Sequence, residues 1–142
     1  LLGTTYFDIE TSLENIAKDG PKAHLAVKGL LEEPIQKILA DDSEILEKGM
    51  KFLGADVETE SGIIDLLLQD SENRIAVVEI ETRASESAVA QVSRLAVGYS
   101  KTRISQNRIR KLIVCEQFDE NTVSACKGAN VELHKVNIRR IV

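Results

Sequence analysis

Residues 62–82, GIIDLLLQDSENRIAVVEIET, decide the fold because two apolar runs flank a short polar turn. Residues 63–69 and 74–82 are predicted strands, joined as an antiparallel hairpin through the turn. Strands this apolar are expected to be buried on both faces of a sheet. Asp65 and Glu79 interrupt the two runs. A carboxylate in such a place is costly to desolvate unless it is paired or binds a metal ion.

Three acidic residues of this hairpin are candidates for one site. Asp65 and Glu79 lie on neighbouring predicted strands, and Glu81 shares a strand face with Glu79 because side chains alternate with a period of two. We expect the three carboxylates to meet at one end of the sheet. An all-oxygen set of this kind suits Mg²⁺ or Mn²⁺ rather than zinc. The alternative is that these acids lie near strand ends and simply reach solvent.

The pattern outside the hairpin predicts an α/β fold. Pro34 suits the first residue of a helix, Asp119 suits the N-cap of a short helix, and Gly128 suits its C-terminal stop. The predicted order gives a mixed central sheet flanked by helices. Residues 1–29 carry no strong motif, so we treat them as an N-terminal extension of a domain at 30–142. The further elements are strands at 50–59, 111–117 and 130–137 and helices at 84–100 and 119–127.

Composition limits the class of protein. The chain has 142 residues and is 43% hydrophobic, which suits one globular domain. No apolar run approaches the roughly 20 residues that span a bilayer, and no signal peptide is visible, so no membrane contact is expected. Two cysteines are too few for a disulfide scaffold, and we expect a reducing cytoplasm. Two histidines do not provide a zinc cluster.

Charge is divided unevenly along the chain. Residues 1–100 carry 9 Lys or Arg and 19 Asp or Glu, a net of −10, whereas residues 101–142 carry 9 and 4, a net of +5. A basic C-terminal third can face a phosphate backbone. It can equally be a solvated face that balances the acidic part. The cations that we expect to contact nucleic acid are Arg83, Lys101, Arg103, Arg108 and Arg110.

The hairpin resembles the core of the PD-(D/E)XK nucleases, in which an Asp on one strand precedes Glu-x-Lys on the next. Residues 30–138 are similar to the C-terminal catalytic domain of the NucS/EndoMS endonucleases of archaea and actinobacteria. This resemblance implies a restriction-endonuclease-like fold and a DNA endonuclease of repair or restriction that uses Mg²⁺ or Mn²⁺. The matching pieces are LLEEPIQKILADDSEILEKG, the hairpin, AVAQVSRLAVGY, KLIVCEQFDE and VELHKVN.

The resemblance also implies roles for individual residues. Asp65 and Glu79 match the metal-binding pair of the family. Gln91 matches a glutamine that follows the catalytic strands and positions the active-site acid or water. Glu32 or Glu33 matches an acid on the first helix, and Glu32 is favoured because it shares the inward helix face.

Two features depart from the family pattern. Glu81 stands where the family has a lysine that activates water and stabilises phosphate charge; a glutamate can act there as a base or a metal ligand. Arg83 can return a positive charge. Residues 1–29 are too few for the family's DNA-binding and dimerisation domain, and no clamp-binding tail is visible after the last predicted strand.

Three functions remain open from the sequence. The first is a metal-dependent DNA endonuclease. Its partner is DNA, and a homodimer is an assembly that the sequence leaves open. The second is a degenerate nuclease fold that binds nucleic acid or a protein without cleaving. The third is a module in which the acids are structural.

Overall fold

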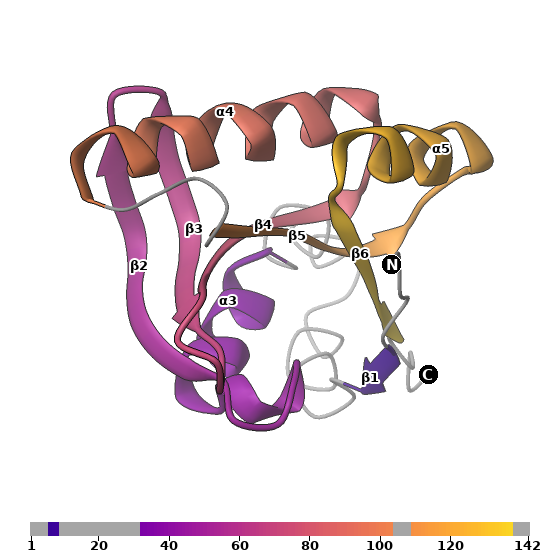
Figure 1. Ribbon diagram of the computed structural model, residues 1–142. Coiled ribbons are helices and arrows are strands. Elements are labelled where there is room, and N and C mark those ends of the chain that lie inside the picture. The colour runs from indigo at the N-terminus through magenta and orange to yellow at the C-terminus, as the bar shows by residue number, and fades with distance from the viewer. Residues whose placement is uncertain (1–5, 9–31, 104–108, 138–142) are drawn as a thin grey trace.

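The computed structural model describes residues 6–8, 32–103 and 109–137. Within this part of the chain, six strands form one sheet in the order β1-β6-β5-β4-β3-β2 (Figure 1). The pairs β1–β6, β6–β5 and β5–β4 are parallel, and the pairs β4–β3 and β3–β2 are antiparallel. The predicted mixed sheet is confirmed, with β1 as a strand that the sequence did not predict. The strands are β1 Tyr6–Asp8, β2 Lys51–Thr59, β3 Gly62–Gln69, β4 Ile75–Arg83, β5 Ile109–Gln117 and β6 Glu132–Asn137.

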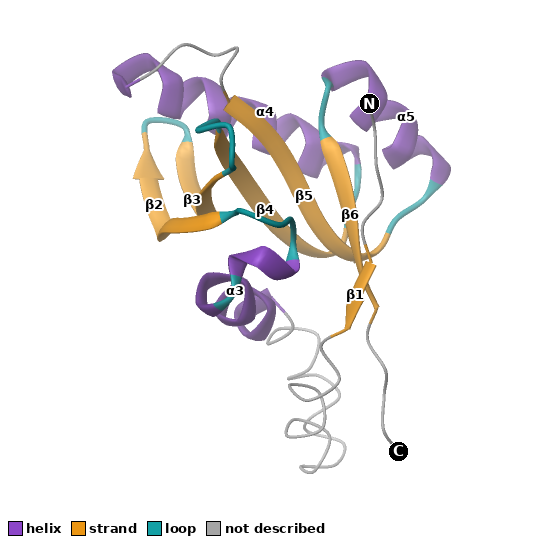
Figure 2. Cartoon of the chain, turned by 60° about the horizontal axis from the view of Figure 1, so that its bottom comes forward, coloured by secondary structure: helices purple, strands orange, loops and turns teal. Residues whose placement is uncertain are grey.

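Helices cover both faces of the sheet. Helix α3 (Glu32–Asp41) and the 3₁₀ helix η2 (Ser43–Ile45) lie on one face, and α4 (Glu86–Arg103) and α5 (Glu120–Ala129) lie on the other (Figure 2). Each face has its own apolar core, so the sheet is buried on both sides as the apolar runs predicted. Among the described residues, no helix is long and apolar enough to cross a membrane.

Two helix ends differ from the prediction. Helix α3 begins at Glu32, so Pro34 lies inside the first turn rather than at its first residue. The first four N–H groups of a helix have no intrahelical acceptor, and a proline is therefore tolerated there. Helix α5 continues through Gly128 to Ala129, and its C-cap Asn130 adopts a left-handed conformation with φ of 56°. Asp119 caps α5 as predicted, accepting a backbone N–H bond of 2.8 Å.

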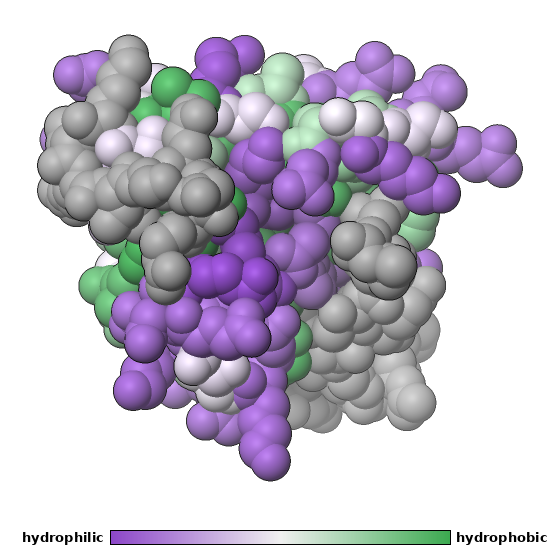
Figure 3. Space-filling model, in the orientation of Figure 1, coloured by the Kyte–Doolittle hydropathy of each residue, from purple (hydrophilic) through white to green (hydrophobic). Residues whose placement is uncertain are grey.

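Strand β2 forms one edge of the sheet. The face seen in Figure 3 is largely hydrophilic over its described area, with apolar residues at the left, where Figure 1 places β2. Phe52 and Leu53 of β2 are among the exposed large hydrophobic residues. The register shifts between Phe52 and Gly54. An irregularity of this kind protects an edge strand from pairing with other chains.

Arg110, near the start of β5, joins three carboxylates from distant parts of the chain. Its guanidinium donates to both Glu47 oxygens at 2.8 and 2.9 Å, to Glu132 at 2.8 Å and to Asp70 at 3.1 Å. The Arg110 side chain is only 12% exposed. The prediction that Arg110 contacts a DNA phosphate is therefore corrected, because its donors are taken up by this internal ion network.

The Arg110 network makes stability sensitive to acid. Burial alone would raise the pKa of Glu132, but its contacts with Arg110 and His134 lower that pKa from 4.5 to about 2. Burial is likewise outweighed at Asp70, whose pKa is lowered by bonds from Arg74 and Arg110. A carboxylate with a depressed folded pKa adds stability above its unfolded pKa and loses that stability as pH falls.

We expect the free energy of unfolding to fall between about pH 5 and pH 2, with Glu132 contributing on the order of 3 kcal/mol of the loss. Urea unfolding of the wild type and of Glu132→Gln across this range measures that contribution. The difference between the two proteins should shrink as the pH falls. Glu44→Gln, at an exposed glutamate, is the matched control. A constant difference from pH 7 to pH 2 would contradict the assignment.

Candidate active site

Asp65 and Glu79 lie on adjacent antiparallel strands, just beyond the last paired residues of β3 and β4. The β3–β4 register ends with Leu66 paired to Val78, and Asp65 and Glu79 are the next residue on each strand. Glu79 is 3% exposed and Asp65 is half-buried. Two carboxylates of one hairpin thus occupy neighbouring positions at the edge of the apolar core.

The two strands change their pairing at Asp65. Its Oδ2 accepts the backbone N–H of Ile80 at 2.8 Å, so a side chain binds the neighbouring strand here. Ile64 belongs to the α4-side core and Leu66 to the α3-side core, although residues two apart share a face in a regular strand. Asp65 therefore lies at a kink of β3, and its carboxylate is directed toward β4.

Helix α4 reaches the second carboxylate. Gln91 Nε2 donates to Glu79 Oε2 at 3.3 Å. Val77, two residues before Glu79, packs in the core beneath α4, which is consistent with Glu79 facing that helix. The structure thus joins Gln91 to Glu79, and it bonds Asp65 to Ile80, the residue that follows Glu79 on β4.

The sequence of the chain matches one known family over most of its length. The model of the Endonuclease NucS C-terminal domain matches residues 31–141. The chain belongs to this family. It is 30% identical to the NucS endonuclease of Methanopyrus kandleri over 92 residues, covering 63% of this chain and 35% of the relative. It is 32% identical to that of Frankia alni over 103 residues, covering 72% and 42%. The chain therefore spans about two fifths of the length of these curated relatives.

Solved structures of NucS/EndoMS proteins share the fold. A structure of an EndoMS–dsDNA2 complex has a TM-score of 0.65 at 20% identity, covering 71% of this chain and 42% of that one. A repair endonuclease from Pyrococcus abyssi has a TM-score of 0.65 at 20% identity, covering 71% and 44%. These similarities confirm the restriction-endonuclease-like α/β fold expected from the hairpin.

Glu81 lies two residues beyond Glu79 on β4. It is half-buried and pairs in register with Cys115 on β5. In the described part of the chain, no group of three or more His, Cys, Asp or Glu residues is arranged to hold a metal ion. Among these residues, the expected meeting of Asp65, Glu79 and Glu81 in one metal-holding group is not found.

Cys115, the β5 partner of Glu81, lies in the core beneath α4. Burial raises the pKa of its thiol to about 12.

The remaining predicted residues differ in how much of each the structure describes. Glu32 is the first residue of α3, and only its backbone is described. Arg83 is exposed at the end of β4. Lys101 and Arg103 belong to the end of α4, where only the backbone is described, and Arg108 lies outside the described residues.

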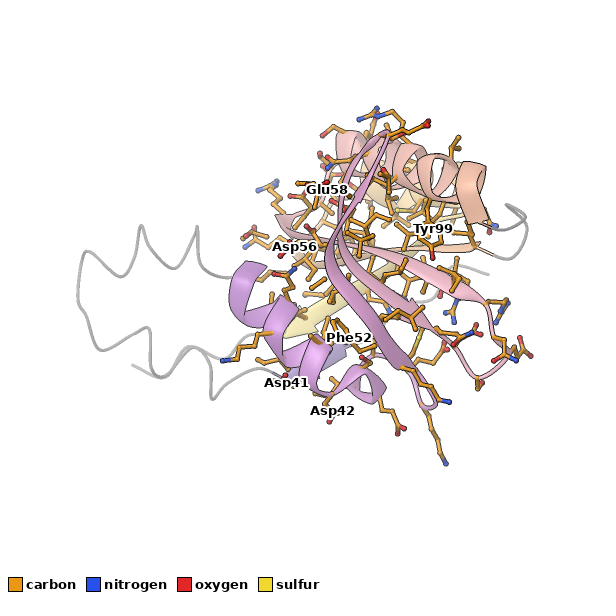
Figure 4. All side chains as sticks on the ribbon, turned by 90° about the vertical axis from the view of Figure 1, so that its left-hand side faces the viewer. Asp41, Asp42, Phe52, Asp56, Glu58 and Tyr99 are labelled. Atoms are coloured by element: carbon orange, nitrogen blue, oxygen red, sulfur yellow. The ribbon has the colours of Figure 1, made fainter. Side chains whose placement is uncertain are left out.

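Two polar residues at the kink were missed by the sequence analysis. Gln36 of α3 donates from Nε2 to the Asp65 carbonyl at 2.9 Å and to Asp56 Oδ1 at 3.1 Å. Asp56 has a φ of 50° and lies on the α3 side of β2 (Figure 4). The sequence held one indication of this feature. Asp56 lies in the middle of a predicted strand, where aspartate is disfavoured and indicates an irregularity.

Proposed function

We propose that this NucS-type domain is a metal-dependent DNA endonuclease that hydrolyses phosphodiester bonds by PD-(D/E)XK chemistry. The observation that carries the proposal is the pair Asp65 and Glu79 at the β3 kink, with Gln91 bonded to Glu79. Membership of the NucS family supports a DNA endonuclease.

The donor set fits Mg²⁺ or Mn²⁺. Mg²⁺ is commonly bound by one or two carboxylates, with water and substrate phosphate oxygens completing the octahedron. Asp65 and Glu79 supply two such carboxylates, and Glu32 is the proposed third acid from α3. A cation bound here would polarise the scissile phosphate and lower the pKa of a water.

The chain's own groups orient these carboxylates. The Ile80 N–H fixes Asp65, and the Gln91 amide fixes Glu79. Ligands held by such outer contacts bind a metal without having to reorganise. Glu81 is assigned as the general base that takes the proton of the attacking water. The hydroxide so formed would add to phosphorus as the bond to the leaving oxygen breaks, and that oxygen would take a proton from solvent water.

DNA contact is assigned to the four predicted cations other than Arg110. These are Arg83 at the end of β4, Lys101 and Arg103 at the end of α4, and Arg108. Each phosphate contact releases counterions, so binding through these side chains should weaken as salt rises.

A degenerate nuclease that binds DNA or a protein without cleaving is the second candidate. Glu81 favours it, since this residue removes the positive charge that the family lysine places near the phosphate.

We expect Mn²⁺ to raise the melting temperature of the wild type and not that of Asp65→Asn. Binding to the folded state alone stabilises by about 2.7 kcal/mol at 100 times Kd. Thermal unfolding with and without MnCl₂ measures this shift, with Asp42→Asn as a matched control at an exposed aspartate. Equal shifts for the wild type and Asp65→Asn would show that Mn²⁺ binds elsewhere.

A further inference from the structure

Gln36 connects α3 to the kinked strands of the candidate active site. Its Nε2 donates at 2.9 Å to the Asp65 carbonyl and at 3.1 Å to Asp56 Oδ1. A primary amide nitrogen carries two N–H groups, so both donors of Gln36 are used at this one place. Because hydrogen bonds are directional, the two bonds define where this point of α3 lies against the sheet.

Asp56 meets Gln36 from the neighbouring strand. The β2–β3 register pairs Ala55 with Leu66 and Val57 with Ile64, which sets Asp56 opposite Asp65.

The backbone of β2 is unusual at this position. Asp56 has a φ of 50°, a left-handed conformation that aspartate and asparagine adopt more readily than most residues. Its side chain is exposed, so apolar burial does not hold this conformation. Strand β2 at Asp56 and strand β3 at Asp65 thus depart from regular geometry at facing positions. Gln36 is hydrogen-bonded to both residues.

The two Gln36 hydrogen bonds also determine where the backbone of Glu32 lies relative to Asp65. Glu32 begins α3 and lies four residues before Gln36, which is about one helical turn along the same face. Ile35 and Leu39 bury the helix against the sheet, but apolar contact is not directional. The hydrogen bonds of the Gln36 amide are directional, so they fix the rotation of α3 about its axis and its position along that axis relative to Asp65.

We propose that Gln36 is a positioning residue of the metal site. It holds the backbone of Asp65, with Asp56 as its second anchor, and sets the register of the helix that carries Glu32. The inference rests on the proposed metal-dependent function. Gln36 acts through Asp65, and loss of such outer contacts lowers metal affinity by roughly 10- to 100-fold.

Four variants separate this role from simple packing. Gln36→Leu removes both donors at similar size, and Gln36→Glu sets a carboxylate against two acceptor oxygens. Asp56→Asn keeps both an acceptor oxygen and tolerance of the left-handed backbone, whereas Asp56→Ala keeps neither. Lys37→Leu, at the next and exposed position of α3, is the matched control.

The experiment titrates the full chain with MnCl₂ without DNA and counts free Mn²⁺ by electron paramagnetic resonance. We expect Gln36→Leu to raise the Mn²⁺ Kd by roughly 10-fold or more. Gln36→Glu should raise it further, and Asp56→Ala should raise it by a smaller factor. Asp56→Asn and Lys37→Leu should match the wild type. Metal-free melting temperatures, recorded in parallel, separate a loss of folding from a loss of affinity.

The possible failures are distinct. A wild type that binds no Mn²⁺ would overturn the proposed function and this inference with it. A wild type that binds Mn²⁺, with Gln36→Leu and Asp56→Ala folded and unchanged in Kd, would overturn the inference alone. If Gln36→Leu fails to fold, Asp56→Ala decides the question, because its side chain is exposed.

Discussion

Arg110→Met is expected to lower the free energy of unfolding by about 3–5 kcal/mol, the effect of removing one partner from a buried ion pair. The substitution keeps much of the side-chain volume but leaves Glu47, Asp70 and Glu132 facing one another. Asp70 has a side chain only 1% exposed, so water cannot replace the lost contact there. Urea unfolding at pH 7 measures the change.

Two further variants test the cause of this loss. Arg94→Met, at an exposed arginine of α4, should change stability by no more than about 0.5 kcal/mol. Adding Glu132→Gln to Arg110→Met should recover part of the loss, since it removes one of the repelling charges. An Arg110→Met protein within about 1 kcal/mol of the wild type would contradict the structural role and return Arg110 to the set of possible DNA contacts.

Glu81→Gln is expected to slow DNA cleavage by about 10²- to 10⁴-fold, the usual contribution of a general base. The amide is the same size but cannot take a proton from water. Glu81→Lys introduces the lysine that the resemblance to the PD-(D/E)XK core implies here and should retain cleavage. Initial rates on plasmid DNA in Mg²⁺ and in Mn²⁺ measure both variants. Glu58→Gln, at an exposed glutamate of β2, is the matched control (Figure 4).

The outcomes of this series distinguish the candidate functions. A wild type and Glu81→Gln that cleave at equal rates would place Glu81 outside the chemistry. A wild type that does not cleave, with a Glu81→Lys protein that does, would favour the degenerate nuclease.

The hairpin could be predicted because its signals are local. Two apolar runs and a polar turn define β3 and β4, and antiparallel pairing then places Asp65 and Glu79 next to the last paired residues, Leu66 and Val78. Helix α4 and its Gln91 follow from apolar periodicity and from the family resemblance. The acid in each apolar run identified the site because burial of an unpaired carboxylate is unfavourable.

The features that could not be predicted depend on distant contacts. The partners of Arg110 lie 63, 40 and 22 residues away, so nearby basic residues indicated a DNA contact where the fold forms an ion network. At the kink of β3, Gln36 from α3 bonds to the Asp65 carbonyl and to Asp56 from β2. The sequence analysis assumed strands whose side chains alternate regularly between the two faces, and such strands have no kink.

The most direct test of the central claim is DNA cleavage by the wild type and by Asp65→Asn. Supercoiled, branched and mismatched DNA are incubated with Mg²⁺, with Mn²⁺ and with EDTA, and Asp42→Asn serves as the control. We predict that the wild type and Asp42→Asn cleave at least one of these DNAs in metal but not in EDTA, and that Asp65→Asn does not cleave. A wild type that leaves every substrate intact in both metals, or an Asp65→Asn protein that cleaves at the wild-type rate, would contradict the account.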